Sequence, residues 1–208
     1  MYRPRTKIKF SIPDKIPLLQ RVQTIKIIGV TFTCSLSVTL HVQSIIAACA
    51  QTLYALRVLR KHGLCDDSLH DVFRAVAVAK LMYAPNAWWG FSNANDRQMI
   101  FAFIRRCIRT GFCYPDLADL HDLYISSDEK LFNKILTCPN HILRTLLPPS
   151  TAQNYSLRNR PHNKLLPDLI SRITNCNFTV RTLYRLLYIL DLRFVLFLCT
   201  VQLRFDSP

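Results

Sequence analysis

The chain has 208 residues, half of them hydrophobic, and its 27 Lys and Arg outnumber 13 Asp and Glu to give a formal net charge of +14. This length and apolar content argue against a disordered chain and allow a real hydrophobic core. The excess of cations predicts a polyanionic partner, with nucleic acid first and an anionic membrane second.

The chain begins with a basic segment, residues 1–24, in which repeated prolines predict an extended arm. No apolar signal-peptide core follows Met1, so we expect an intracellular protein, either cytoplasmic or nuclear. Residues 25–32 (IKIIGVTF) are apolar and β-branched, which is typical of one buried strand. Gly29 within that strand would permit the close approach of another backbone.

Three amphipathic helices are predicted next, because apolar residues recur at steps of three and four. Ser35 or Ser37 can cap the first helix. Gly63 and Gly111 follow the first and third helices, where glycine readily adopts the positive φ that ends a helix. The predicted helices cover residues 38–62, 67–83 and 95–110.

Two of these helices carry clustered cations. On the first, the last turn holds Arg57, Arg60 and Lys61, which either compensate the helix dipole or contact phosphates. On the third, which also contains Arg97, no acid three or four residues away offsets its last arginines. These arginines, Arg105, Arg106 and Arg109, therefore favour an external anion.

Two short motifs between the helices have competing interpretations. The adjacent Asp66 and Asp67 could be the metal-binding pair of a nucleotidyl transferase, but they lie between a glycine and a helical pattern, which favours helix capping. Trp88 and Trp89 could stack on bases, although a corner between two helices favours packing in the core.

Residues 116–147 predict two or three short helices, one of them opened by a capping box at residues 126–129 (SSDE). The basic segment 154–167 (NYSLRNRPHNKLLP) is bounded by proline and predicted to be extended, as a linker or a grip on an anion. Its candidate contacts are Arg158, Arg160, His162 and Lys164. The apolar run 183–205 is interrupted by charges, which favours a buried element over a membrane span.

The eight cysteines are irregularly spaced, which predicts reduced and mostly buried thiols. A zinc site is the alternative, but its first pair lacks the tight spacing of structural zinc sites and two loops would have to converge. The ligands of that site would be Cys107, Cys113, Cys138 and His141.

Several strings taken together resemble the C-terminal part of the reverse transcriptase of non-LTR, LINE-type retrotransposons. They are IKIIGVTF, LSVTLHVQSI with LYALRVLRKHG, DVFRAVAVAKLMYAPNAWWGF, and DEKLFNKIL with NHILRTLLPP and NYSLRNRPHNKLLP. The match covers roughly residues 8–188 in order. The resemblance implies a mainly α fold, a helical thumb-like bundle with a short β element left from a polymerase palm. It divides the chain into a basic arm (1–24), a palm-edge strand (25–37), a thumb-like domain (38–112), a C-terminal helical region (113–188) and an unrelated tail (189–208).

The same resemblance implies a function without catalysis by this chain alone. The family's palm aspartates, which would bind Mg²⁺, precede the matched region, so no catalytic residue or cofactor ligand is carried over. RNA or DNA backbone and a separate palm domain are the implied partners, and a small-molecule substrate is not. The family pattern Y-x-L-R-x-R-x-H-N is matched from Tyr155 to Asn163, which favours the anion grip. The alternatives are an unstable relic of a decayed element and a small basic membrane-associated protein.

Overall fold

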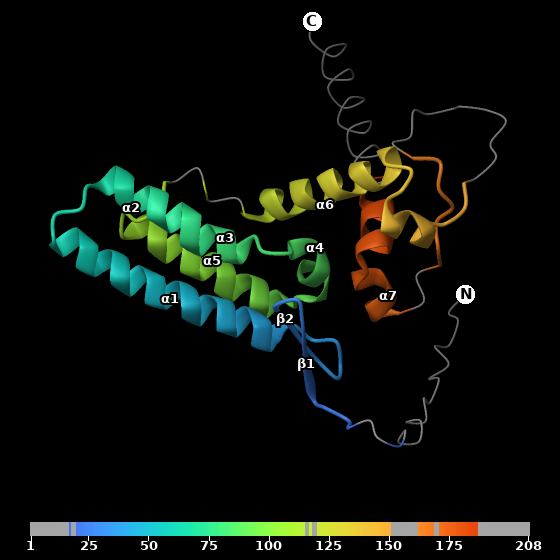
Figure 1. Cartoon of the computed structure of the whole chain (residues 1–208), viewed down its shortest axis with the longest axis horizontal. Coiled ribbons are helices and arrows are strands. Elements are labelled where there is room, and N and C mark those ends of the chain that lie inside the picture. Colours follow the sequence, from blue (N-terminus) through green and yellow to red (C-terminus); the bar gives the residue numbers. More distant parts are fainter. Residues whose placement is uncertain are drawn as a thin grey trace, which may run out of the picture.

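The computed structural model describes residues 17, 20–114, 117, 120–150, 162–168 and 171–186. These residues form helices and a small antiparallel sheet, which confirms the mainly α class (Figure 1). Most of the predicted arm, Arg158, Arg160 and the tail 189–208 lie outside the described residues.

In chain order the elements are β1 (Thr24–Ile27), β2 (Val30–Thr33), α1 (Thr39–Lys61), α2 (Asp66–Phe73), the π-helical η1 (Arg74–Val78), α3 (Ala79–Leu81), α4 (Pro85–Trp88), η2 (Trp89–Phe91), α5 (Ala94–Arg109), α6 (Leu120–Thr137), η4 (Ile142–Leu146) and α7 (Arg172–Cys176). Residues 178–186 are also helical.

Residues 24–33 form a β-hairpin, so the prediction of a single buried strand is wrong. β1 pairs antiparallel with β2 through a two-residue turn at Ile28 and Gly29. Both turn residues have positive φ, 44° and 83°, as this kind of turn requires. Gly29 is therefore a turn residue, and a Cβ there would lie 3.2 Å from the ring of Tyr83 rather than against another backbone.

The hairpin packs on the rest of the structure through β2 and through its turn, where the Tyr83 hydroxyl donates to the Ile28 carbonyl at 3.1 Å. Val30 is buried, and Phe32 meets Phe91 edge to face with ring centroids 6.1 Å apart. Every residue of β1 is exposed, including Ile25 and Ile27 at about half of their surface. An apolar strand thus lies open to solvent in the described structure.

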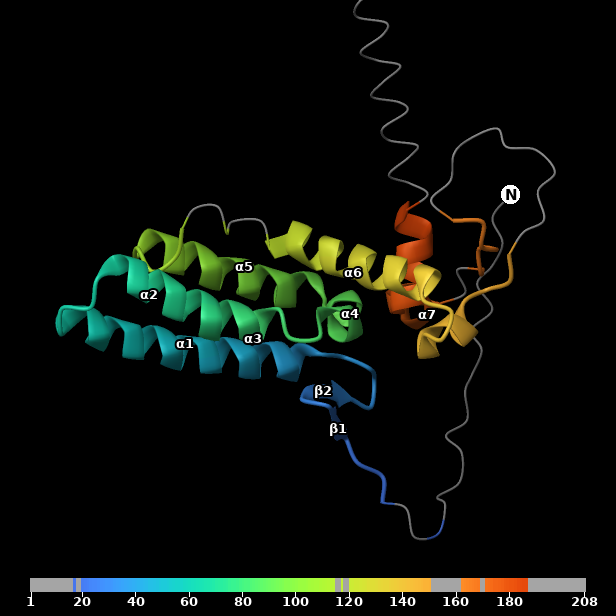
Figure 2. The ribbon, with the colours of Figure 1, turned by 45° about the horizontal axis from the view of Figure 1, so that its top comes forward.

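α1, the α2–η1–α3 helix and α5 form a three-helix bundle (Figures 1 and 2). α1 and α5 run in the same direction, because Thr39 at the start of α1 donates to Asp96 near the start of α5, and Arg60 at the end of α1 donates to Thr110 beyond the end of α5. The three predicted helices are confirmed, and the second contains a π-helical turn. Their shared core includes Val42, Cys49, Leu53, Leu56, Leu69, Phe73, Ile100, Ile104 and Cys107.

The glycines that end two helices behave as predicted, with φ of 89° at Gly63 and 69° at Gly111. The start of α1 differs from expectation. Val38 occupies the N-cap position without a side-chain hydrogen bond, so neither Ser35 nor Ser37 is the cap residue. The Ser37 hydroxyl still accepts a hydrogen bond from the Thr39 amide at 3.3 Å.

Within the described residues, α1 is long and apolar enough to cross a membrane by length and composition, with a mean hydropathy of 1.3. This is weak support for a membrane span, since a core helix can have the same properties. In the fold one side of α1 packs on α2 and α5. The predicted membrane anchor of the alternative hypothesis, residues 183–205, lies mostly outside the described residues.

The corner made by α4 and η2 joins the bundle to α6. Trp88 and Trp89 are both buried there, which confirms core packing for the pair. The Trp88 indole donates to the Tyr83 carbonyl at 2.9 Å. Tyr124 of α6 lies against Trp89 with ring centroids 4.2 Å apart, and its hydroxyl donates to the Leu81 carbonyl.

α6 is one continuous helix, so the predicted capping box at residues 126–129 is wrong. The residues before and after that motif are buried on the same face of the helix, so packing favours a helix that continues through residues 126–129. The buried residues of α6 are Leu120, Tyr124, Asp128, Phe132 and Ile135. Their spacing of three and four places Asp128 on the apolar face.

Asp128 is the centre of a buried ionic network, with only 1% of its surface exposed. Arg181 donates to both carboxylate oxygens, at 2.8 and 3.0 Å, and Arg185 lies 3.4 Å from one of them. The Asn86 amide donates to the same carboxylate at 2.8 Å. Gly90 makes room for this network, because a Cβ there would clash with the Arg181 guanidinium. The network therefore ties helix 178–186 to α6 and to the corner.

We expect Asp128→Asn to lower the free energy of unfolding by about 3 kcal/mol, because it leaves two partly buried arginines without their carboxylate. The neighbouring Glu129→Gln, which removes the same charge outside the network, should change it by less than about 0.5 kcal/mol. Urea unfolding followed by circular dichroism measures both values. Equal effects of the two substitutions would contradict the network's role.

Candidate nucleic-acid interface

The outer face of α5 carries three exposed arginines, Arg105, Arg106 and Arg109. Within the described part of the chain, their side chains make no hydrogen bond or ion pair. Arg105 and Arg109 are four residues apart, and such a like-charged pair destabilises a helix by about 0.2–0.5 kcal/mol. The fold thus leaves these charges exposed to solvent without an acidic partner among the described residues, and only the helix dipole favours Arg106 and Arg109 in the last turn.

Two shallow hollows of about 470 and 450 Å³ run along this face. Arg105 lines both of them, Arg97 and Gln98 line the first, and Arg109 lines the second. Arg97 and Arg109 are separated by three and a third helical turns, about 18 Å along the axis. We call Arg97, Gln98, Arg105 and Arg109 the cationic face of α5.

Arg97 belongs to this face although the sequence did not single it out as a contact residue. Its Nε donates to the Ser92 hydroxyl at 3.0 Å, and its guanidinium lies 4.8 Å from the centroid of the Trp89 ring. Burial, with a smaller contribution from the nearby Arg181, lowers the pKa of Arg97. The spacing of eight residues to Arg105 is the sequence signal that places both on one side of the helix.

The last turns of α1 carry two further candidate cations. Arg57 and Lys61 are exposed, as a surface contact requires. Burial raises the pKa of the Cys107 thiol on α5 to about 12, and the positive charges of Arg106 and Arg57 oppose that rise.

Arg60 does not belong to this surface, because the fold uses it internally. Its guanidinium donates to the Thr110 carbonyl at 2.8 Å, pairs with Asp66 at 3.2 Å and lies 3.9 Å from the centroid of the Phe112 ring. It also donates to the carbonyl of Gly111. Arg60 lies in the last turn of α1, as the dipole interpretation expects, and it also satisfies carbonyls just beyond the C-terminal end of α5.

His162 is buried, at 7% exposure, which does not fit the predicted contact with an external anion. Its Nδ1 accepts a hydrogen bond from the Lys164 amide at 3.2 Å, and its Nε2 lies 3.2 Å from the Leu183 carbonyl. The Lys164 ammonium donates to the Ser150 hydroxyl at 3.1 Å. These contacts attach the described end of the basic segment to helix 178–186. Arg158 and Arg160 lie outside the described residues.

Asp66 and Asp67 lie in the first turn of α2 and make different contacts. Asp66 pairs with Arg60, and Asp67 accepts a hydrogen bond from the Tyr114 hydroxyl at 3.0 Å. Cys65 is the N-cap residue and makes no side-chain cap, so the aspartates support the helix through its dipole rather than by capping. No group of three or more His, Cys, Asp or Glu in the described ranges could hold a metal ion, and this includes the considered zinc ligands.

Fewer of the described cysteines are buried than predicted. Cys49, Cys107 and Cys113 are buried, whereas Cys34, Cys65 and Cys138 are exposed. Burial raises the pKa of the Cys49 thiol to about 11. A hydrogen bond with Ser68 lowers the pKa of Cys65. Thiol reactivity should therefore differ sharply along the chain.

We expect iodoacetamide at pH 8 to alkylate Cys65 faster than Cys34 and Cys138, because its lowered pKa gives more thiolate. Cys49 and Cys107 should react at least about 100-fold more slowly, since both are buried and mostly protonated. Peptide mapping by mass spectrometry gives each rate, and unfolding in urea should remove the differences. Alkylation of Cys107 at the rate of Cys65 would contradict the packing of α5.

The candidate interface therefore consists of the cationic face of α5 with Arg106 of the same helix, and the exposed Arg57 and Lys61 of α1 are further candidate contacts. It offers guanidinium groups on a rigid helix and no grouped metal ligands among the described residues. Such a surface can bind phosphate groups through charge-assisted hydrogen bonds. The chain matches no family model, no curated protein and no solved structure.

Proposed function

We propose that this protein binds the sugar–phosphate backbone of nucleic acid through the cationic face of α5. One observation carries the proposal: Arg105 and Arg109 are exposed, lie one helical turn apart and have no acidic partner among the described residues. Unpaired like charges on one helical face lower the stability of the helix, and an external polyanion would reverse that effect.

The composition of the face favours backbone contacts over contacts with bases. Guanidinium groups match the geometry of phosphate oxygens. The aromatic residue of this face, Phe101, is only partly exposed and packs edge to face on Trp89 with centroids 6.3 Å apart. It is therefore a poor platform for stacked bases, and binding should depend little on nucleotide sequence.

We further propose that the chain is a thumb-like part of a non-LTR retrotransposon reverse transcriptase that acts beside a separate palm domain. A helical bundle following a short β element supports this proposal. The exposed apolar side chains of the hairpin, with Ile28 at 83% exposure, also fit a site that another domain covers. In this role the chain holds nucleic acid and performs no catalysis.

The same exposed apolar side chains favour a second candidate, a relic that has lost its partner and does not fold stably alone. Ile142 is 85% exposed, so the exposed apolar residues extend beyond the hairpin. A single cooperative thermal transition from a monomer in solution would support the binding protein. Broad melting with aggregation would support the relic.

The test of binding is a pair of double variants with the same charge change. We expect Arg105→Gln with Arg109→Gln to weaken binding of a fluorescein-labelled 20-base-pair duplex at least tenfold, as measured by fluorescence anisotropy. The slope of log affinity against log salt should fall in magnitude by about 1.8, because two phosphate contacts are lost.

The control is Lys130→Gln with Lys134→Gln on α6, where two exposed cations are also four residues apart. Its affinity and salt slope should stay within about twofold and 0.5 of the unmodified protein, since only long-range attraction is lost. Equal losses in the two double variants would reduce the effect to net charge. That result would contradict a defined interface on α5.

A further inference from the structure

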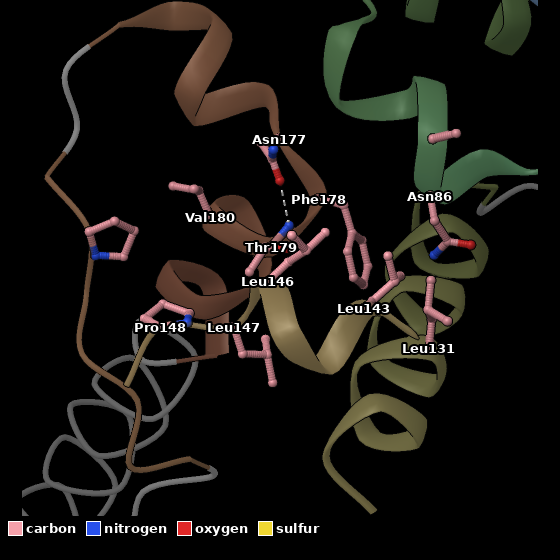
Figure 3. Close-up of a pocket in the computed structure, with 12 residues that line it drawn as sticks. Asn86, Leu131, Leu143, Leu146, Leu147, Pro148, Asn177, Phe178, Thr179 and Val180 are labelled. Carbon is pink, nitrogen blue, oxygen red and sulfur yellow. Dashed lines mark hydrogen bonds between the residues drawn. The ribbon is translucent and has the colours of Figure 1, made fainter. Parts of the chain in front are cut away.

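An apolar pocket lies away from the cationic face of α5, between α6, η4 and helix 178–186. Its volume is about 640 Å³, inside the range of about 300–1,000 Å³ that is typical of small-molecule sites. Figure 3 shows Leu131 of α6, Leu143 of η4 and Phe178 gathered on one side of it. Leu147, Pro148 and Pro167 add further apolar surface.

No charged residue lines this pocket among the described residues. The chain has a net charge of +14, so a lining without charged residues differs from the cationic face of α5. A phosphate or carboxylate would lose its hydration in the pocket without gaining a cation. The pocket therefore suits an uncharged molecule and is chemically distinct from the proposed nucleic-acid interface.

Most polar groups of the lining are already engaged within the protein. The Asn86 side chain donates to Asp128 and accepts a hydrogen bond from Ser127 at 3.2 Å. The side-chain carbonyl oxygen of Asn177 accepts a hydrogen bond from the backbone amide of Thr179 at 2.9 Å, as the dashed line in Figure 3 marks. The side-chain amide nitrogen of Asn177 and the hydroxyl of Thr179 are the lining polar groups that remain available, and both can donate a hydrogen bond to an acceptor on a ligand.

The apolar walls are incompletely covered by the described protein. Leu146 lines the pocket and is 68% exposed. Removing apolar surface from water contributes about 25 cal/mol per Å², so a lipophilic molecule seated here would be stabilised by the walls. The ionic network of Asp128 holds two of these walls in place, because it joins α6 to helix 178–186.

We propose that this pocket binds an uncharged, lipophilic small molecule carrying a hydrogen-bond acceptor. The apolar walls hold the body of the molecule, and Asn177 and Thr179 orient its acceptor. This site does not depend on the proposed function, since it shares no residue with the cationic face of α5.

Nile red is a suitable probe, because it is uncharged, lipophilic and carries a carbonyl acceptor. We expect the full chain to bind it saturably at one site, with rising fluorescence and a micromolar Kd. Leu146→Trp should weaken binding at least tenfold by filling the pocket. Ile142→Trp is the matched control, since Ile142 lies on the same short helix, is 85% exposed and does not line the pocket.

Both substitutions are at exposed positions, so the melting temperature should not change. The control variant should bind Nile red within about twofold of the unmodified chain. Equal binding by the two variants would assign the dye to scattered surface patches and overturn the proposal. Absence of saturable binding by the full chain would also overturn it.

Discussion

The C-terminal part of the structure depends on the ion pairs that the buried Asp128 carboxylate forms with Arg181 and Arg185. Arg181 and Arg185 converge on it from helix 178–186, and Asn86 reaches it from the corner of α4. A buried cation requires a partner of this kind, and the chain has few acids. Three of these acids already have partners: Asp66 pairs with Arg60, the Asp96 carboxylate accepts hydrogen bonds from Thr39 and from the Asn93 amide, and Asp128 pairs with Arg181.

Two sets of described arginines therefore have different roles. Arg60, Arg181 and Arg185 bind carbonyls and carboxylates inside the molecule, so their charges are compensated. Arg105 and Arg109 remain on the surface of a rigid helix whose opposite side is anchored in the core. Neither set of arginines lines the apolar pocket beside α6, so the pocket is a chemically separate binding environment.

Local sequence signals predicted the bundle well. Helical periodicity and the positive φ of Gly63 and Gly111 determine where the long helices lie and where they end. The hairpin at Ile28 is not predicted because it lacks the usual turn sequence. The other differences depend on contacts between distant residues. Residues 126–129 have the local pattern of a capping box, but the burial of Asp128 depends on Arg181, which is 53 residues away. The internal role of Arg60 likewise requires the end of another helix, which no local pattern reveals.

We propose that Arg105 and Arg109 on α5 are available to bind nucleic acid, whereas Arg60 and Arg181 are engaged in contacts within the protein. Nuclear magnetic resonance of the arginine Nε–Hε groups during titration with a short duplex tests this claim directly. We expect the signals of Arg105 and Arg109 to shift with the duplex, and those of Arg60 and Arg181 to stay unchanged. Shifts confined to Arg60 and Arg181, or equal shifts in all four, would contradict the account.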